Sequence, residues 1–115
     1  MTRVVITGMG TVSPIGNDTA SFVENLMAGK LGITEITKFD ASATGISVAG
    51  EVKDFDPKLR LGKKAAKRMD LYSQYAVHTA LEALEQAGIN EENTDPYDMG
   101  VIIGSGIGGL TTIQE

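Results

Sequence analysis

The chain of 115 residues contains no cysteine and no tryptophan, and it has one histidine. The absence of cysteine excludes disulfides, thiolate metal sites and a cysteine nucleophile within this chain. The histidine, His78, has no neighbours in the sequence that would form a metal site or a catalytic triad with it. We therefore predict no catalytic residue, no metal site and no cofactor among residues 1–115.

Long apolar runs are also missing. No run approaches the roughly 20 residues that span a membrane, and the apolar stretch after Arg3 is too short for a secretory signal. The net charge of −5 argues against a general nucleic-acid-binding surface. Hydrophobic residues make up 42 % of the chain, which is typical of a globular protein. We predict one cytoplasmic domain at most, with neither a membrane nor a nucleic acid as its partner.

Two short apolar runs end in glycines. Val4–Ile6 leads to Gly8 and Gly10, and Val101–Ile103 leads into a glycine loop, residues 104–109, with glycine at 104, 106, 108 and 109. Continuous branched apolar runs are typical of strands buried on both faces of a parallel sheet. Ligands bind at the carboxyl edge of such sheets. The pattern predicts an α/β fold in which both glycine loops lie at the same edge of one parallel sheet.

Cap residues predict two helices. Asp18 is placed to begin a helix of about three turns, which Gly29 would end. Asp70 is placed to cap a longer helix that runs to Ala87, with Gly88 as the residue that ends it. A broad, alanine-rich stripe that includes Leu71 and Leu81 predicts that this helix packs on the sheet. Gln74, His78, Glu82 and Glu85 fall on the opposite side, so we predict an ordinary surface histidine.

The remaining segments are less regular. Residues 30–59 are aperiodic, and they fit either a plain loop or an excursion with one or two short strands, one of them at Ile46–Val52. Residues 90–98 form an acidic, turn-rich connection. Residues 110–115 resemble the opening of another helix, and no cap or breaker follows them. This last feature predicts that the chain is a fragment of something longer.

A basic cluster interrupts an acidic chain at residues 60–69, where five of ten residues are lysine or arginine. Lys64, Lys67 and Arg68 share one face if this segment is helical. Such a patch would steer an acidic partner and fix its register. The alternative is a solvated turn that pairs with Asp54, Asp56 or Asp70, and charge alone favours it because surface ion pairs are common and weak.

The glycine loop matches a dinucleotide-binding pattern, Gly104-x-Gly106-x-x-Gly109. The acidic residue that this pattern requires about 20 positions later lies outside the chain, so the match is weak. The earlier candidate, Gly8-x-Gly10, has Ser13 where glycine or alanine should stand. A phosphate-binding P-loop is absent. A Rossmann-type nucleotide-binding domain stays open as an alternative on these residues.

Several spaced motifs together resemble the start of a β-ketoacyl-[acyl carrier protein] synthase, closest to the type II enzymes of bacterial fatty-acid synthesis. The resemblance covers all 115 residues in order, and the GIGG form of the last loop favours type II. The motifs are VVITGMGTVSPIGN, LMAGKLGI, KFD, AGEVKDFD, KKAAKRMD and GVIIGSGIGGL.

The resemblance implies a thiolase-like fold, layered α-β-α-β-α, of which residues 1–115 are the N-terminal part of the first half. It also implies a homodimer that takes an acyl group from acyl carrier protein onto a cysteine and condenses it with malonyl carrier protein. The cysteine and two histidines of this reaction fall beyond Glu115 in the family pattern, and His78 matches neither histidine. The chain alone is therefore predicted to be inactive and, with half a sheet uncovered, to self-associate.

Four residues match functional positions of the family. The resemblance implies that Lys64, Lys67 and Arg68 bind acyl carrier protein, which reverses the preference for a solvated turn. It implies that Ile107 lines the acyl pocket. A non-catalytic synthase homologue remains an alternative, which the sequence after residue 115 would decide.

Overall fold

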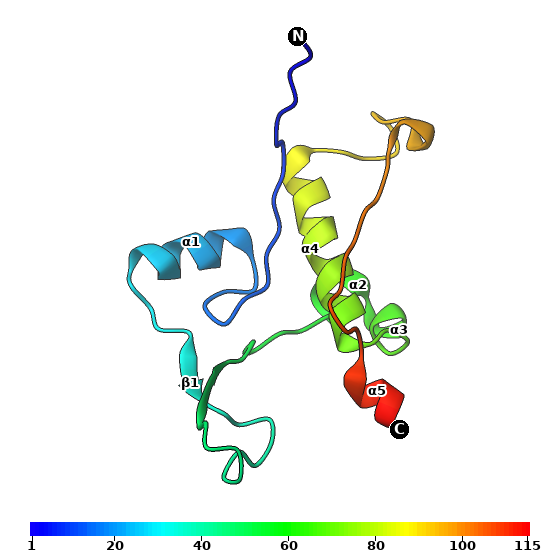
Figure 1. The fold of residues 1–115 in the computed structure, drawn as a ribbon. Helices are drawn as coiled ribbons and strands as arrows, with labels where there is room; N and C mark the ends of the chain where they lie inside the picture. Colours follow the sequence, from blue (N-terminus) through cyan, green and yellow to red (C-terminus); the bar gives the residue numbers. More distant parts are fainter. The chain divides into compact units, whose positions relative to one another are not determined.

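The computed structural model describes all 115 residues, and they form two compact units. The hairpin unit is Thr11–Phe55, and the helical unit combines Met1–Gly10 with Asp56–Glu115 (Figure 1). The hairpin unit contains α1 (Thr19–Met27), β1 (Ile33–Glu35) and β2 (Val48–Gly50). The helical unit contains α2 (Lys58–Leu61), α3 (Lys63–Ala66), α4 (Leu71–Ala87), the 3-10 turn η1 (Pro96–Asp98) and α5 (Leu110–Gln114).

Helix α1 begins and ends where its cap residues predict. The carboxylate of Asp18 accepts a hydrogen bond from the backbone N–H of Ser21 at 2.7 Å, which satisfies one of the donors that a helix start leaves free. Gly29, after the helix, adopts a φ of 69°, a conformation that costs glycine little. Both predictions for this helix are confirmed.

Strands β1 and β2 form an antiparallel pair in which Ile33 lies opposite Gly50. Of the two interpretations of residues 30–59, the one with short strands is therefore confirmed. This two-stranded sheet is the only sheet of the structure.

Hydrogen bonds of the Glu51 side chain join the end of β2 to the segment that follows β1. Its side chain is only 9 % exposed. The carboxylate accepts a hydrogen bond from the hydroxyl of Thr37 at 2.8 Å and others from the backbone N–H groups of Thr37 and Lys38. The hydrogen bond from the Thr37 hydroxyl, and after it those from the two backbone N–H groups, lower the pKa of Glu51 below its ordinary value of 4.5 although burial opposes this.

The hairpin unit should therefore lose stability in acid. A carboxyl group whose pKa is lowered by folding contributes stability above its unfolded pKa, and this contribution is lost as the pH falls through the folded value. In the native sequence we expect the thermal midpoint of the hairpin unit to decrease as the pH drops below about 4.5. In Glu51→Gln the midpoint should already be lower above that pH and should decrease less in acid, where Asp40, whose pKa is lowered by hydrogen bonds from Ser42, still contributes. Glu35→Gln, an exposed change of the same charge on β1, is the control. A Glu51→Gln midpoint equal to that of the control would contradict the role of Glu51.

In the helical unit, α4 is the element against which the others lie. Helix α2 packs against both α3 and α4. In Figure 1 the segment after η1 runs back along α4 toward α5. Helix α4 ends at Gly88, which is left-handed at a φ of 68°, and the N–H of Ile89 donates to the carbonyl of Leu84 at 3.1 Å. The predicted end of the helix is confirmed.

Gly8 and Gly10 are required for close packing on α4. A Cβ on Gly8 would lie 2.0 Å from the carbonyl oxygen of Ala83, and a Cβ on Gly10 would lie 2.0 Å from that of Thr79. The N–H of Met9, between them, donates to the side chain of Gln86 at 2.7 Å. These glycines face helix carbonyls, which repel anions, so their role is packing rather than phosphate binding.

Gly8→Ala should therefore detach the first segment from α4. Forcing a methyl group against backbone costs about 1–3 kcal/mol, so we expect the Met9 amide to exchange with solvent about 5- to 150-fold faster. Gly100→Ala is the matched control, because nothing lies within 4 Å of a Cβ there. Equal exchange in the two variants would show that the close approach is unimportant.

The two strands predicted at Val4–Ile6 and Val101–Ile103 are absent from the structure, and with them the parallel sheet. The first run leads into Thr7–Gly10, and the second lies within Met99–Gly104. Both segments line an open groove of about 760 Å³ together with residues of α4. A strand exists only where its backbone groups pair with a neighbour. Neither run has such a neighbour here, and Ile102 is fully exposed.

The predicted faces of α4 are wrong in part, because two residues of the predicted polar side are buried. His78 is only 4 % exposed and Glu82 8 %, whereas Leu71 and Leu81 of the predicted apolar stripe are exposed. The stripe was expected to face a sheet, and that sheet is absent from the structure. Ala83 and Ala87 of this stripe instead pack against the segment that contains Gly8.

The buried core is small. Ala66 is the only buried apolar residue, and no large side chain is fully buried. A chain of this length could bury far more of its apolar surface on folding, so the expected core of a complete domain is not present. None of the helices combines the length and the apolar character that a membrane crossing requires.

Candidate functional site

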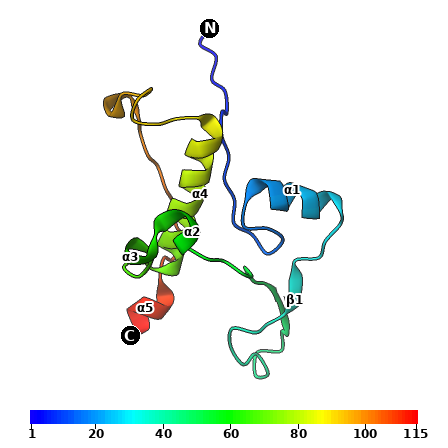
Figure 2. The same ribbon diagram turned by 180° about the vertical axis from the view of Figure 1, so that it is seen from behind.

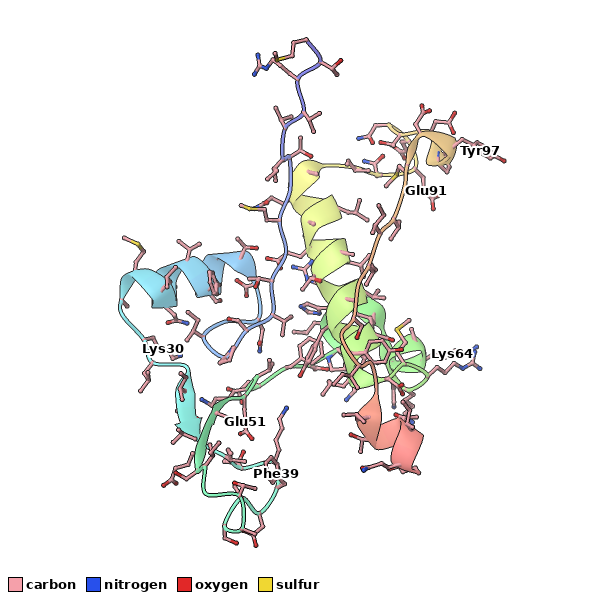
Figure 3. The ribbon with its side chains drawn as sticks, in the orientation of Figure 1. Lys30, Phe39, Glu51, Lys64, Glu91 and Tyr97 are labelled. Atoms are coloured by element: carbon pink, nitrogen blue, oxygen red, sulfur yellow. The ribbon has the colours of Figure 1, made fainter.

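The basic residues predicted to bind a partner are exposed on and after α3. Lys64 lies within α3, Lys67 caps its C-terminus and Arg68 follows. The salt bridge between Arg60 and Glu85 does not involve these three residues, and they form no ion pair with Asp54, Asp56 or Asp70. Figure 3 shows the side chain of Lys64 extending away from the helix. We call Lys64, Lys67 and Arg68 the basic triad.

A backbone break sets the orientation of the basic triad. Gly62 adopts a φ of 76° between α2 and α3, so the cluster is divided between two short helices instead of one. A hollow of about 510 Å³ beside this break has basic and apolar residues in its wall. An acidic partner with some apolar surface would fit such a wall better than a free ion. The lining residues are Leu61, Gly62, Lys63, Lys64, Ala65, Arg68 and Met69.

Ile107 is presented by the glycine loop. Its side chain is 69 % exposed. The N–H of Gly108 donates to the hydroxyl of Ser105 at 3.0 Å, and Gly108 has a φ of 76°, which favours glycine. A Cβ on Gly108 would lie 3.6 Å from the ring of Tyr72, in the first turn of α4. The loop is therefore positioned by its own turn and by α4.

The basic triad and the glycine loop both lie near the N-terminal end of α4. The side-chain amide of Gln74 donates to the carbonyls of Ala66 and Met69, at 2.9 Å and 3.0 Å, and so ties the end of α3 to α4. Seen from behind, α2, α3 and α5 gather at this end of α4 (Figure 2). No sequence pattern indicates this role of Gln74, because its partners are backbone carbonyls.

The structure contains no group of three or more histidine, aspartate or glutamate side chains that could hold a metal ion. The candidate site consists of the exposed basic triad and the glycine loop, both near the N-terminal end of α4.

All residues from 1 to 115 match the family described as Beta-ketoacyl synthase, N-terminal domain. The chain belongs to the β-ketoacyl synthase family. This membership confirms the resemblance seen in the sequence motifs.

Curated relatives in this family are similar along nearly the whole chain. The 3-oxoacyl-[acyl-carrier-protein] synthase 2 of Coxiella burnetii is 45 % identical over 113 residues, which cover 98 % of this chain and 27 % of the relative. The enzyme of the same name from Synechocystis sp. is 46 % identical over 115 residues, with the same two shares. The chain thus spans about a quarter of the length of these synthases.

A solved structure, described as the ishigamide ketosynthase/chain length factor, is similar with a TM-score of 0.69 and 36 % identity. The match covers 77 % of this chain and 22 % of that one. This ketosynthase neighbour supports the thiolase-like, α/β class predicted from the sequence.

Proposed function

We propose that the chain is the N-terminal portion of a 3-oxoacyl-[acyl carrier protein] synthase 2, a cytoplasmic acyltransferase that elongates fatty acyl chains. An acyl group passes from its carrier thioester to a cysteine, and the carrier thiol leaves. Malonyl carrier protein then loses CO₂, and its carbanion attacks the acyl thioester and expels the cysteine thiolate. The family membership and the relatives' names support this reaction. In this proposal the cysteine lies outside these 115 residues, which contain none.

The basic triad is proposed to bind acyl carrier protein. The observation that carries this proposal is an exposed set of three positive side chains without ion pairs in a chain of net charge −5. Unpaired charges are available to a partner without first breaking an internal contact. They would bring an acidic carrier protein to the surface quickly and in one orientation.

Ile107 is proposed to line the acyl pocket. It is the one branched side chain in a loop that otherwise consists of glycines and Ser105. Glycine neighbours allow such a loop to shift when a longer acyl chain enters.

In the longer protein we propose that Val4–Ile6 and Val101–Ile103 become strands of a mainly parallel sheet. Val4 is 91 % exposed and Ile102 fully exposed here, and apolar runs with free backbone groups pair readily with other strands. The same exposed surface supports the expectation that the chain self-associates, and that the complete enzyme is a homodimer.

A condensation assay tests the proposed function. A full-length protein that begins with this chain should release CO₂ from malonyl carrier protein and form the 3-oxoacyl product when acyl carrier protein is supplied. The 115-residue chain alone should form none. No product from the full-length protein would support the non-catalytic homologue instead.

A further inference from the structure

We propose that Asp70 is a positioning residue that holds the glycine loop against the first turn of α4 and thereby sets acyl-chain selectivity. The selectivity part rests on the role proposed above for Ile107, whereas the contact itself does not. Asp70 precedes α4 and follows Arg68 of the basic triad by two residues.

Asp70 stands at the N-cap of α4, but its side chain makes no capping hydrogen bond. An aspartate there ordinarily accepts from a backbone N–H of the first helical turn. Instead, its Oδ1 accepts from the hydroxyl of Thr112 in α5 at 2.9 Å, a contact between residues 42 positions apart. Asp70 is therefore the N-cap residue of α4, as the sequence predicts, but its carboxylate is used for a tertiary contact instead of a capping hydrogen bond.

The other carboxylate oxygen restricts the end of the glycine loop. A Cβ on Gly109 would lie 2.5 Å from Oδ2 of Asp70 and 3.4 Å from the hydroxyl of Thr112. The backbone can approach the carboxylate this closely only because residue 109 is glycine. Gly109 thus lies against the carboxylate of Asp70, and Gly108 lies beside the ring of Tyr72. These two neighbours position the part of the glycine loop that follows Ile107.

The position of Asp70 also links the loop to the basic triad. Gln74, one turn further along α4, binds the carbonyl of Met69 immediately before Asp70. A displacement of α3 by a bound partner would therefore be transmitted to the residue that holds the loop. Loss of the contact between Asp70 and Thr112 should let Ile107 move. This movement would broaden the range of acyl chains that the enzyme accepts.

Hydrogen exchange of the Gly108 amide, which donates a hydrogen bond to the hydroxyl of Ser105 within the glycine loop, tests the contact without any assumption about function. We expect Asp70→Ala and Thr112→Val to raise its rate about tenfold, as the loss of one hydrogen bond to a charged group predicts. Asp70→Asn keeps an acceptor, and Thr111→Val removes a neighbouring hydroxyl for which the structure shows no hydrogen bond, so both should stay within about twofold. Thr112 is exposed, so Thr112→Val tests the contact even if Asp70→Ala does not fold. Equal rates in Thr112→Val and Thr111→Val would overturn the proposal.

The acyl-chain profile of the full-length enzyme tests the consequence. We expect Asp70→Ala to change the ratio of kcat/KM between long and short acyl carrier substrates at least threefold, and Asp70→Asn to restore it. A changed profile for Ile107→Phe with an unchanged profile for Asp70→Ala would overturn the positioning role and leave the proposed function intact. An unchanged profile for both variants would overturn the proposed role of Ile107 as well.

Discussion

Reversing the basic triad, as Lys64→Glu, Lys67→Glu and Arg68→Glu together, is expected to weaken binding of acyl carrier protein about 10- to 100-fold. Exposed ion pairs contribute about 0.2–1 kcal/mol each, and reversal replaces each attraction with a repulsion. The three side chains form no internal ion pair, so their change should leave the fold of the helical unit unaltered. Fluorescence anisotropy with labelled carrier protein and the full-length enzyme measures the affinity.

Salt and a matched variant separate this effect from a general change of charge. Exposed charges are screened over about 8 Å at physiological ionic strength, so the difference between native and reversed proteins should shrink as salt is added. Arg3→Glu, Lys30→Glu and Lys53→Glu together change the net charge equally at exposed positions elsewhere. Equal losses in the two triple variants would contradict a specific docking surface.

Ile107→Phe is expected to restrict the full-length enzyme to shorter acyl chains. If Ile107 lines the acyl pocket, the added ring fills space that the distal carbons of a long chain would occupy. Overpacking of this kind costs about 1–3 kcal/mol, which corresponds to about a 5- to 150-fold loss of kcat/KM for long chains. The rate with short chains should change little, and a series of acyl carrier substrates of increasing length measures the profile.

The control for this variant is Ile113→Phe. Ile113 is also exposed, at 74 %, but it lies on α5 outside the glycine loop. The same added volume there should leave the profile unchanged. An unchanged profile in Ile107→Phe itself would remove Ile107 from the acyl pocket.

Local features of this fold were predictable from the sequence, because their causes lie within a few residues. Asp18 caps α1 with its own neighbours, and Gly29 and Gly88 end helices through their backbone conformation. The short strands in the irregular segment were one of two open interpretations. They depended on pairing between β1 and β2, which a single segment does not reveal.

Non-local features were not predictable in the same way. The apolar runs at Val4–Ile6 and Val101–Ile103 have the composition of buried strands, but a strand also needs partners, and 115 residues do not supply them. The same lack of covering surface explains why Leu81 is exposed while His78 is buried. Helical periodicity identifies two faces of α4 but does not identify which one the rest of the chain covers.

The candidate site was only partly visible in the sequence. The basic triad stood out by charge, and family resemblance was needed to prefer a partner over internal pairing. Ile107 was assigned by resemblance alone. Asp70 and Gln74 act through Thr112 and two carbonyls, and neither contact leaves a pattern in the sequence.

The most direct measurement is intact-mass spectrometry after incubation with acyl carrier protein loaded with an acyl chain. If this chain supplies recognition while the nucleophile lies elsewhere in the synthase, the full-length protein should gain the mass of one acyl group per subunit, and the 115-residue chain should keep its own mass. An acyl adduct on the 115-residue chain, or none on the full-length protein, would contradict that division of roles.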